Sequence, residues 1–175
     1  MARIVCQFSQ SFLFVFCGDI MVFTLVYVSD ANLCAFGNSA AQQIETIEQR
    51  STFNNDLYDV RGFLFYYDKK FLQILQGEFD SIISVFGKIK EDPRHSNIRI
   101  IWFSNAQKHS FEKWSMAYSM SYAAENYKTM VEKSGLMSRF VPENGHLTPS
   151  SFQLLMHFAT QSEDELNVNQ DKLYG

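Results

Sequence analysis

The pattern of apolar and polar residues first indicates regular structure at residues 22–28, VFTLVYV, which are apolar except for Thr24. The segment is rich in β-branched and aromatic side chains, which favour a strand. Because strand side chains alternate between faces, Phe23, Leu25 and Tyr27 are expected on one face. Residues 29–38 then lose the pattern and are expected to form a loop.

The next segment has the sequence signals of a helix. Ser39 and Gln42 have the spacing of a capping box, in which the two side chains satisfy backbone N–H groups at a helix start. The helix is expected to end near Arg50. Residues 51–59, STFNNDLYD, are polar and are expected to form a turn.

A β-hairpin is predicted next. Residues 60–67, VRGFLFYY, and residues 70–76, KFLQILQ, both read as strands, and Asp68 and Lys69 between them are the length of a tight turn. Residues 79–91 have apolar residues at helical spacing, and Pro93 is expected to end that helix.

Two further strands are predicted, at residues 98–104 and 111–119. The order βαββαββ predicts an α+β fold, a ferredoxin-like sandwich whose five-stranded sheet carries two helices on one face.

Two C-terminal helices are predicted after the sheet. The first contains Ala123, Tyr127, Met130 and Val131. The second begins at Thr148 and Pro149, an N-cap followed by proline at the first helical position, and contains Phe152, Leu155, Met156 and Ala159. Packing on the sheet is the favoured role for their apolar faces, and an oligomer or partner interface is the alternative. The predicted organisation is an extension or mis-assigned start at 1–20, a domain at 21–120, a helical relay at 121–161 and a disordered polar tail at 162–175.

Composition narrows the possible classes of protein. The chain has 175 residues, is 46% hydrophobic and carries a formal net charge of −4. No basic footprint is present, so no nucleic-acid partner is expected. The apolar run at residues 12–17, FLFVFC, is too short to span a bilayer, so no membrane partner is expected. Three cysteines without metal spacing favour a reduced, cytoplasmic protein.

The common enzyme motifs are absent from the sequence, which contains no GxGxxG, P-loop, HExxH or GxSxG. The four histidines lack metal-ligand spacing, so neither a metal nor a catalytic residue is predicted. An acylphosphatase-like hydrolase on the same scaffold is the alternative from another class. It would need an arginine-containing anion loop after the first strand, and residues 29–38 contain neither arginine nor lysine. A flavin-free structural relative is a third possibility.

Two polar residues on apolar strand faces are candidates for function. Gln73 shares its strand face with Phe71 and Leu75, and a buried amide must find hydrogen-bond partners. Tyr27 ends an apolar strand, and a buried phenol also needs a partner. Taken alone, each residue is more simply explained as an ordinary core residue whose polar group is satisfied.

Several segments together resemble the BLUF family, sensors of blue light using FAD. The resemblance covers residues 22–116. It rests on LVYVS (25–29), the asparagine pair at 54 and 55, GFLFYYDKKFLQILQGE (62–78), DPRH (92–95) and SFEKWSM (110–116). It implies a flavin bound between the two helices, with its ring edge facing the sheet.

The resemblance also implies roles for individual residues. Tyr27 would donate an electron and a proton to the excited flavin, and Gln73 would bridge this tyrosine and the ring. Trp114 and Met116 match strand positions that carry the signal outward. The implied cofactor-binding residues are Ile47, Ser51, Asn54, Asn55, Phe71, Gln73, Lys88, Ile89, Asp92, Arg94 and His95.

Departures from the family pattern are few. The stretch between Tyr27 and Asn55 is about four residues longer than the pattern, Arg61 replaces a small polar residue, and Gln76 replaces a common glutamate. Gln76 is expected to face away from the partners of Gln73 and to have a small effect. The resemblance is to the short stand-alone type, so an unidentified effector protein and a homo-oligomer are the expected partners.

Overall fold

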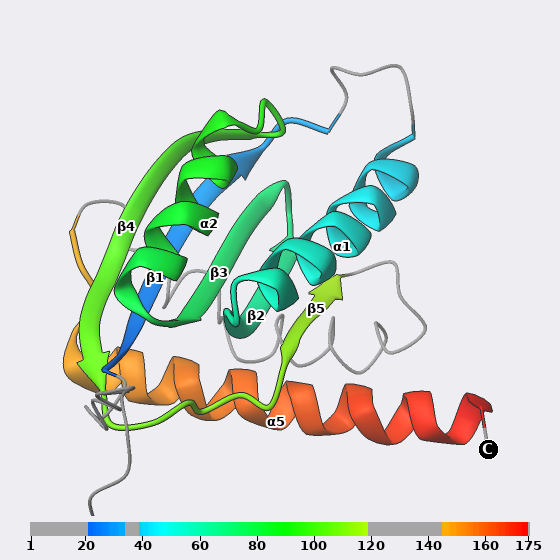
Figure 1. Cartoon of the computed structure of the whole chain (residues 1–175). Helices are drawn as coiled ribbons and strands as arrows, with labels where there is room; N and C mark the ends of the chain where they lie inside the picture. Colours follow the sequence, from blue (N-terminus) through cyan, green and yellow to red (C-terminus); the bar gives the residue numbers. More distant parts are fainter. Residues whose placement is uncertain (1–20, 34–38, 119–144, 175) are drawn as a thin grey trace, which may run out of the picture.

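The computed structural model describes residues 21–33, 39–118 and 145–174 (Figure 1). Its elements are β1 (Val22–Ala31), α1 (Ala40–Leu57), β2 (Arg61–Tyr67), β3 (Lys70–Gly77), α2 (Phe79–Glu91), β4 (His95–Ala106), β5 (Trp114–Tyr118) and α5 (Pro149–Tyr174). The predicted first C-terminal helix lies outside the described residues.

The five strands form one sheet in the order β4-β1-β3-β2-β5. β1 runs antiparallel to both β3 and β4, β2 runs antiparallel to β3, and β5 pairs with β2 in parallel. The order of the first four strands is that of a ferredoxin-like fold, with β5 added beside β2. The predicted fold class is confirmed.

Helices cover both faces of the sheet (Figure 1). α1 and α2 lie on one face, called here the helix-pair face, where Leu25, Tyr27 and Leu75 pack against Ile82 and Phe86. α5 lies on the opposite face, called here the α5 face. Its core residues are Val26, Val28, Phe63, Phe65, Leu72, Ile74, Ile101, Phe111, Leu147, Leu155, Phe158 and Ala159. The second C-terminal helix therefore packs on the sheet, as favoured from its apolar pattern.

The helix caps and the hairpin turn predicted from local sequence signals are present at the predicted residues. The Ser39 hydroxyl accepts a hydrogen bond from the backbone N–H of Gln42, and the Gln42 side chain accepts one from the backbone N–H of Ser39. Asp68 and Lys69 both have positive φ, 47° and 59°, as the tight turn of a two-residue hairpin requires. Thr148 caps α5 by accepting a hydrogen bond from the backbone N–H of Ser151.

The ends of several elements differ from the prediction. The turn expected at residues 51–59 is wrong, because α1 continues to Leu57. Its polar side chains indicated a loop, but they face solvent or a cavity rather than a core. β1 continues to Ala31 into the expected loop, β4 is longer than predicted at both ends, and β5 begins only at Trp114.

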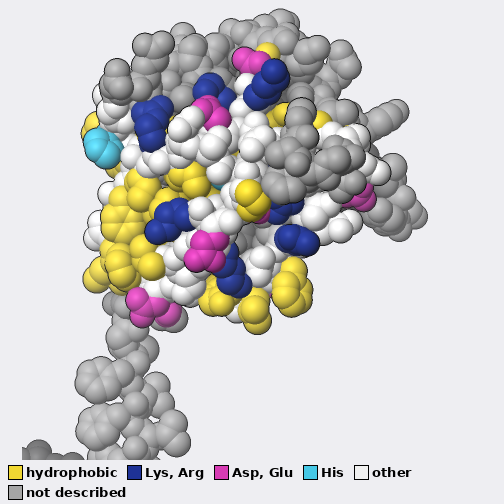
Figure 2. All heavy atoms as spheres, turned by 90° about the horizontal axis from the view of Figure 1, so that it is seen from above, with side chains coloured by type: hydrophobic (Ala, Val, Ile, Leu, Met, Phe, Trp, Pro, Cys, Tyr) yellow, Lys and Arg dark blue, Asp and Glu magenta, His cyan; other side chains and the backbone are white. Residues whose placement is uncertain are grey.

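The tail at residues 162–175 was predicted to be disordered, and that prediction is wrong as far as Tyr174, because α5 continues to this residue. A polar composition does not exclude a helix that begins in a packed segment and continues past it. No helix among the described residues is long and apolar enough to cross a bilayer. On the face shown in Figure 2, lysine and arginine side chains alternate with acidic ones and do not form one basic patch.

Candidate functional site

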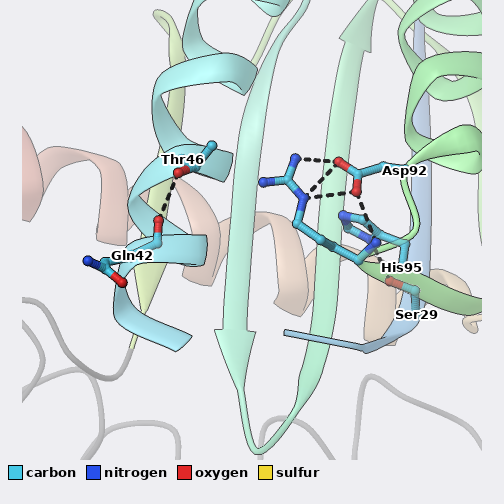
Figure 3. Close-up of polar contacts among 6 residues, drawn as sticks. Ser29, Gln42, Thr46, Asp92 and His95 are labelled. Carbon is cyan, nitrogen blue, oxygen red and sulfur yellow. Dashed lines mark hydrogen bonds and ion pairs between the residues drawn. The ribbon is translucent and has the colours of Figure 1, made fainter. Parts of the chain in front are cut away.

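A cavity of about 570 Å³ lies between α1 and α2, above the helix-pair face of the sheet. Figure 3 shows its two sides, with Thr46 on α1 opposite Asp92 and His95. Its volume is within the range of pockets that hold drug-sized ligands and cofactors. The lining residues are Gln43, Thr46, Ile47, Arg50, Ser51, Asn54, Asn55, Leu64, Gln73, Val85, Lys88, Ile89, Glu91, Asp92, Pro93, Arg94 and His95.

Tyr27 and Gln73 form a hydrogen-bonded pair at the floor of this cavity. They are direct partners across β1 and β3, and the Tyr27 hydroxyl donates to Gln73 Oε1 at 2.5 Å. Tyr27 is fully buried and Gln73 is 2% exposed. Burial raises the pKa of Tyr27 well above its usual value, and the nearby Asp92 carboxylate raises it further. The phenol is therefore protonated at neutral pH, with its proton directed at the glutamine carbonyl.

Asn54 and Asn55 lie in the last turn of α1 and line the cavity. Asn55 is 1% exposed, and its side-chain nitrogen is buried without a hydrogen-bond partner. Buried donors are rarely left unpaired, so this nitrogen is suited to bond an acceptor of a ligand in the cavity. The Oδ1 atom of Asn54 accepts a hydrogen bond of 3.1 Å from Lys88 of α2, which links the two helices across the cavity.

The turn after α2 carries three ionisable residues. Asp92 accepts hydrogen bonds from Arg94 Nε at 2.8 and 3.0 Å, from Arg94 Nη2 and from the Arg94 backbone N–H at 2.9 Å. Burial opposes ionisation of Asp92, but the hydrogen bonds and charge of Arg94 outweigh it, and the pKa of the carboxyl is lowered.

His95 begins β4 beside this ion pair. Its Nδ1 lies 2.9 Å from the Ser29 hydroxyl (Figure 3), and its ring stacks on Phe71 with centroids 4.4 Å apart. Burial lowers the pKa of His95 to about 4, with the Asp92 charge opposing the shift and the Arg94 charge adding to it. The imidazole is therefore neutral at pH 7.

Trp114 and Met116 lie on β5, and both face the helix-pair side of the sheet. They pack with Ile47, Leu64 and Phe71 beneath the cavity, 6% and 4% exposed. Neither side chain lines the cavity, and the indole nitrogen of Trp114 is buried without a partner. Phe71 does not line it either, because the His95 ring lies against it.

The structure brings most of the sequence-predicted residues together. Ile47, Ser51, Asn54, Asn55, Gln73, Lys88, Ile89, Asp92, Arg94 and His95 all line the cavity, and Tyr27 contacts it through Gln73. Their functional roles stay predictions.

Seven lining residues were not predicted, namely Gln43, Thr46, Arg50, Leu64, Val85, Glu91 and Pro93. Those in α1 share one helical face with Ile47 and Asn54, at spacings of three and four residues. All three lie within the helix as predicted, and its extension to Leu57 adds Ser51 and Asn54 to the same face. Leu64 and Val85 are ordinary apolar core positions, which leave no distinguishing signal in a sequence.

Comparison with known proteins identifies the family of this chain. The model of the BLUF family, "Sensors of blue-light using FAD", matches residues 22–117. The chain therefore belongs to the BLUF family, and its cofactor is FAD.

Curated relatives are distant and much longer. The chain is 26% identical to the photoactivated adenylate cyclase subunit beta of Euglena longa over 100 residues, and 24% identical to that of Euglena gracilis. Each match covers 57% of this chain and 11% of the relative.

Solved structures match over more of the chain. The structure titled "BlsA photo-activated state" has a TM-score of 0.62 and 26% identity, covering 80% of this chain and 95% of that one. "BlsA ground state" has a TM-score of 0.59 and 28% identity, covering 80% and 88%. The dark-state structure of BlrB, at 21% identity and a TM-score of 0.61, supports the fold alone.

The residues around the cavity fit a flavin. Ile47 of α1 and Ile89 of α2 provide apolar walls on facing helices, which suit the two faces of a flat aromatic ring. The unpartnered Asn55 nitrogen is a donor suited to a carbonyl on the polar edge of that ring. Arg50 and Lys88 line the same cavity and carry positive charge suited to phosphate groups, whereas the charge of Arg94 is paired with Asp92.

Proposed function

We propose that this chain is an FAD-binding blue-light photoreceptor in which Tyr27 and Gln73 form the photoactive switch. The observation that carries the proposal is the buried hydrogen bond between these two side chains at the wall of the cavity. Bound FAD supplies the light-absorbing ring and, once excited, a strong one-electron acceptor. The protein supplies the electron donor and the path of the proton.

Tyr27 is suited to transfer an electron and a proton together. A phenol that loses an electron becomes a strong acid, and its proton then moves to the nearest acceptor. That acceptor is Gln73 Oε1, 2.5 Å away. Because burial raises the pKa of Tyr27, the phenol keeps this proton in the dark and the switch does not titrate near neutral pH.

Gln73 is suited to change its hydrogen bonds after the electron and proton transfer from Tyr27. Its amide has an acceptor end, bonded to Tyr27, and a donor end with two N–H groups. Rotation or tautomerisation of the amide exchanges what it presents to the phenol and to the cavity. The hydrogen-bond pattern around the flavin edge then differs between dark and light, although no covalent bond forms between the flavin and the protein.

The output of the switch is a change in a protein–protein interaction, carried by β5 and the C-terminal helices. β5 supports this because Trp114 and Met116 pack directly beneath the cavity. α5 supports it because its apolar side packs on the sheet, while Leu154 on its other side is 48% exposed. The partner is an effector protein in the cytoplasm, and the receptor itself is a homo-oligomer. Residues 21–120 are the sensor domain and 121–161 the relay.

Absorption spectroscopy tests the proposal. The purified protein, reconstituted with FAD, is expected to show a flavin spectrum that shifts reversibly to longer wavelength under blue light. Tyr27→Phe and Gln73→Ala are expected to bind FAD and to lose the shift. Tyr67→Phe is the matched control, because Tyr67 packs on the α5 face of the sheet. It is expected to keep the shift.

Two results would contradict this function. A protein that stays colourless after incubation with FAD would exclude the photoreceptor. A normal red shift in Tyr27→Phe would exclude the assigned switch while leaving flavin binding intact.

A further inference from the structure

Gln76 is a second buried glutamine on β3, on the opposite side of the sheet from Gln73. The two residues are three apart, so their side chains point to opposite faces. Gln76 is 1% exposed and lies on the α5 face, at the end of the strand. A buried amide in this position must be hydrogen-bonded at both ends or destabilise the fold.

Both ends of the Gln76 amide are bonded. Its Oε1 accepts a hydrogen bond from the Ser110 backbone N–H at 2.7 Å. Its Nε2 donates to the Thr24 hydroxyl at 2.9 Å and to the Ser110 hydroxyl at 3.4 Å. The side chain therefore joins β3 and β1 to the loop between β4 and β5.

The contact with β1 repeats the photoactive pair on the other face of the sheet. Thr24 is the direct cross-strand partner of Gln76, as Tyr27 is of Gln73. Each strand carries its two contact residues three positions apart, a distance of about 10 Å along a strand. The same pair of strands is thus bonded through side chains on both faces, and a shift of β3 relative to β1 strains both contacts.

The contact with Ser110 leads to α5. The next residue, Phe111, is 2% exposed and packs in the same apolar core as Leu155 and Phe158 of α5. The loop is therefore held from two sides, by the Gln76 amide at Ser110 and by the α5 face at Phe111.

We propose that Gln76 is a positioning residue that couples β3 to the β4–β5 loop and, through Phe111, to α5. The proposal rests on the proposed light switch at Tyr27 and Gln73. When that switch displaces β3, the loop must follow or the two part-buried hydrogen bonds between Gln76 and Ser110 must break. Since the Gln76 amide is itself buried, losing these partners is costly, so the loop follows and the packing of α5 changes. The effect of this residue is then larger than the resemblance implied.

The test separates photochemistry from its transmission. FAD-loaded full-length protein is followed by absorption for the red shift and by hydrogen exchange for α5, over residues 149–162, in the dark and under blue light. The wild type is expected to show a red shift and a light-dependent change in α5 exchange. Gln76→Met keeps the side-chain length and removes the amide. It is expected to keep the red shift, while the change in α5 falls about threefold or more.

Two matched variants complete the design. Gln76→Glu is expected to restore the α5 response, because a carboxyl group can accept from the Ser110 N–H and still bond the Thr24 hydroxyl. Gln107→Met makes the Gln76→Met change at an exposed position of the same loop and is expected to behave as wild type. If Gln76→Met does not fold, Ser110→Pro removes the same N–H from the exposed side of the contact and is expected to reduce the α5 response equally.

The outcomes distinguish this inference from the function on which it rests. A red shift with an undiminished α5 response in Gln76→Met, or in Ser110→Pro where that variant replaces it, overturns the coupling role and leaves the photoreceptor standing. A wild type with a red shift but no light-dependent change in α5 also overturns it. A wild type without any red shift overturns the proposed function instead.

Discussion

Neutral His95 makes the stability of the protein depend on pH in a window set by its pKa. The pKa of His95 is about 4 in the folded protein, against 6.5 for the free side chain. Above pH 6.5 the imidazole is neutral in both the folded and the unfolded chain. As the pH falls from 6.5 towards 4, the unfolded chain binds a proton that the folded protein does not, so stability is lost. Between pH 7.5 and pH 5 this loss amounts to about 2 kcal/mol.

Urea unfolding in the dark, at pH 7.5 and at pH 5, measures this loss in the wild type and in His95→Gln. Asp92 contributes little in this window, because its lowered pKa places its titration below pH 5. His95→Gln has a fixed cost at both pH values, but it removes the titrating group. The free-energy difference between wild type and variant is therefore expected to shrink by about 2 kcal/mol at the lower pH. A difference that stays constant within about 0.5 kcal/mol would refute the assignment of a low pKa to this histidine.

Three further changes test the packing and the site. Gly62→Ala places a Cβ 2.0 Å from the carbonyl oxygen of Ile74, at a φ of +146° that L-residues rarely adopt. Urea unfolding is expected to show that the free energy of unfolding falls by about 3 kcal/mol or more. An unfolding midpoint equal to that of the wild type would contradict the close strand contact. Gly87→Ala in α2 has nothing within 4 Å and is the control, expected to be neutral or stabilising by up to about 1 kcal/mol. Asn55→Ala removes a donor that has no protein partner. FAD titration should therefore show about tenfold weaker binding, with little change in the unfolding midpoint. An unchanged affinity for FAD would show that Asn55 does not bind the cofactor. Phe158→Ala should cost about 3 kcal/mol in thermal unfolding, since the ring packs 5.4 Å from Phe65, and a much smaller loss would mean that α5 contributes little to the core.

Local chemistry made part of the fold readable from the sequence. Ser39 and Gln42 determine a helix start, Asp68 and Lys69 a tight turn, and Thr148 and Pro149 a second helix start, because each signal depends only on neighbouring residues. Period-two alternation then assigned faces to the strands correctly. Polarity failed as a boundary signal at residues 51–57, where the polar side chains of α1 line a cavity or face solvent.

The sequence by itself determined the order of the elements and, through several spaced segments, the BLUF resemblance. It did not determine the long-range contacts, because partners such as Tyr27 and Gln73 lie far apart along the chain. Taken alone, Tyr27 and Gln73 looked like two ordinary core residues, and the BLUF resemblance implied their pairing. The register of β1 and β3 supplies the contact itself, with the Tyr27 hydroxyl 2.5 Å from Gln73 Oε1. The same holds for the buried Asn55 nitrogen without a partner and for the Gln76 amide with hydrogen bonds at both ends. Both features exist only once the helices and strands have packed. Tertiary structure alone decided these features, since hydrogen bonding and burial are properties of neighbours in space.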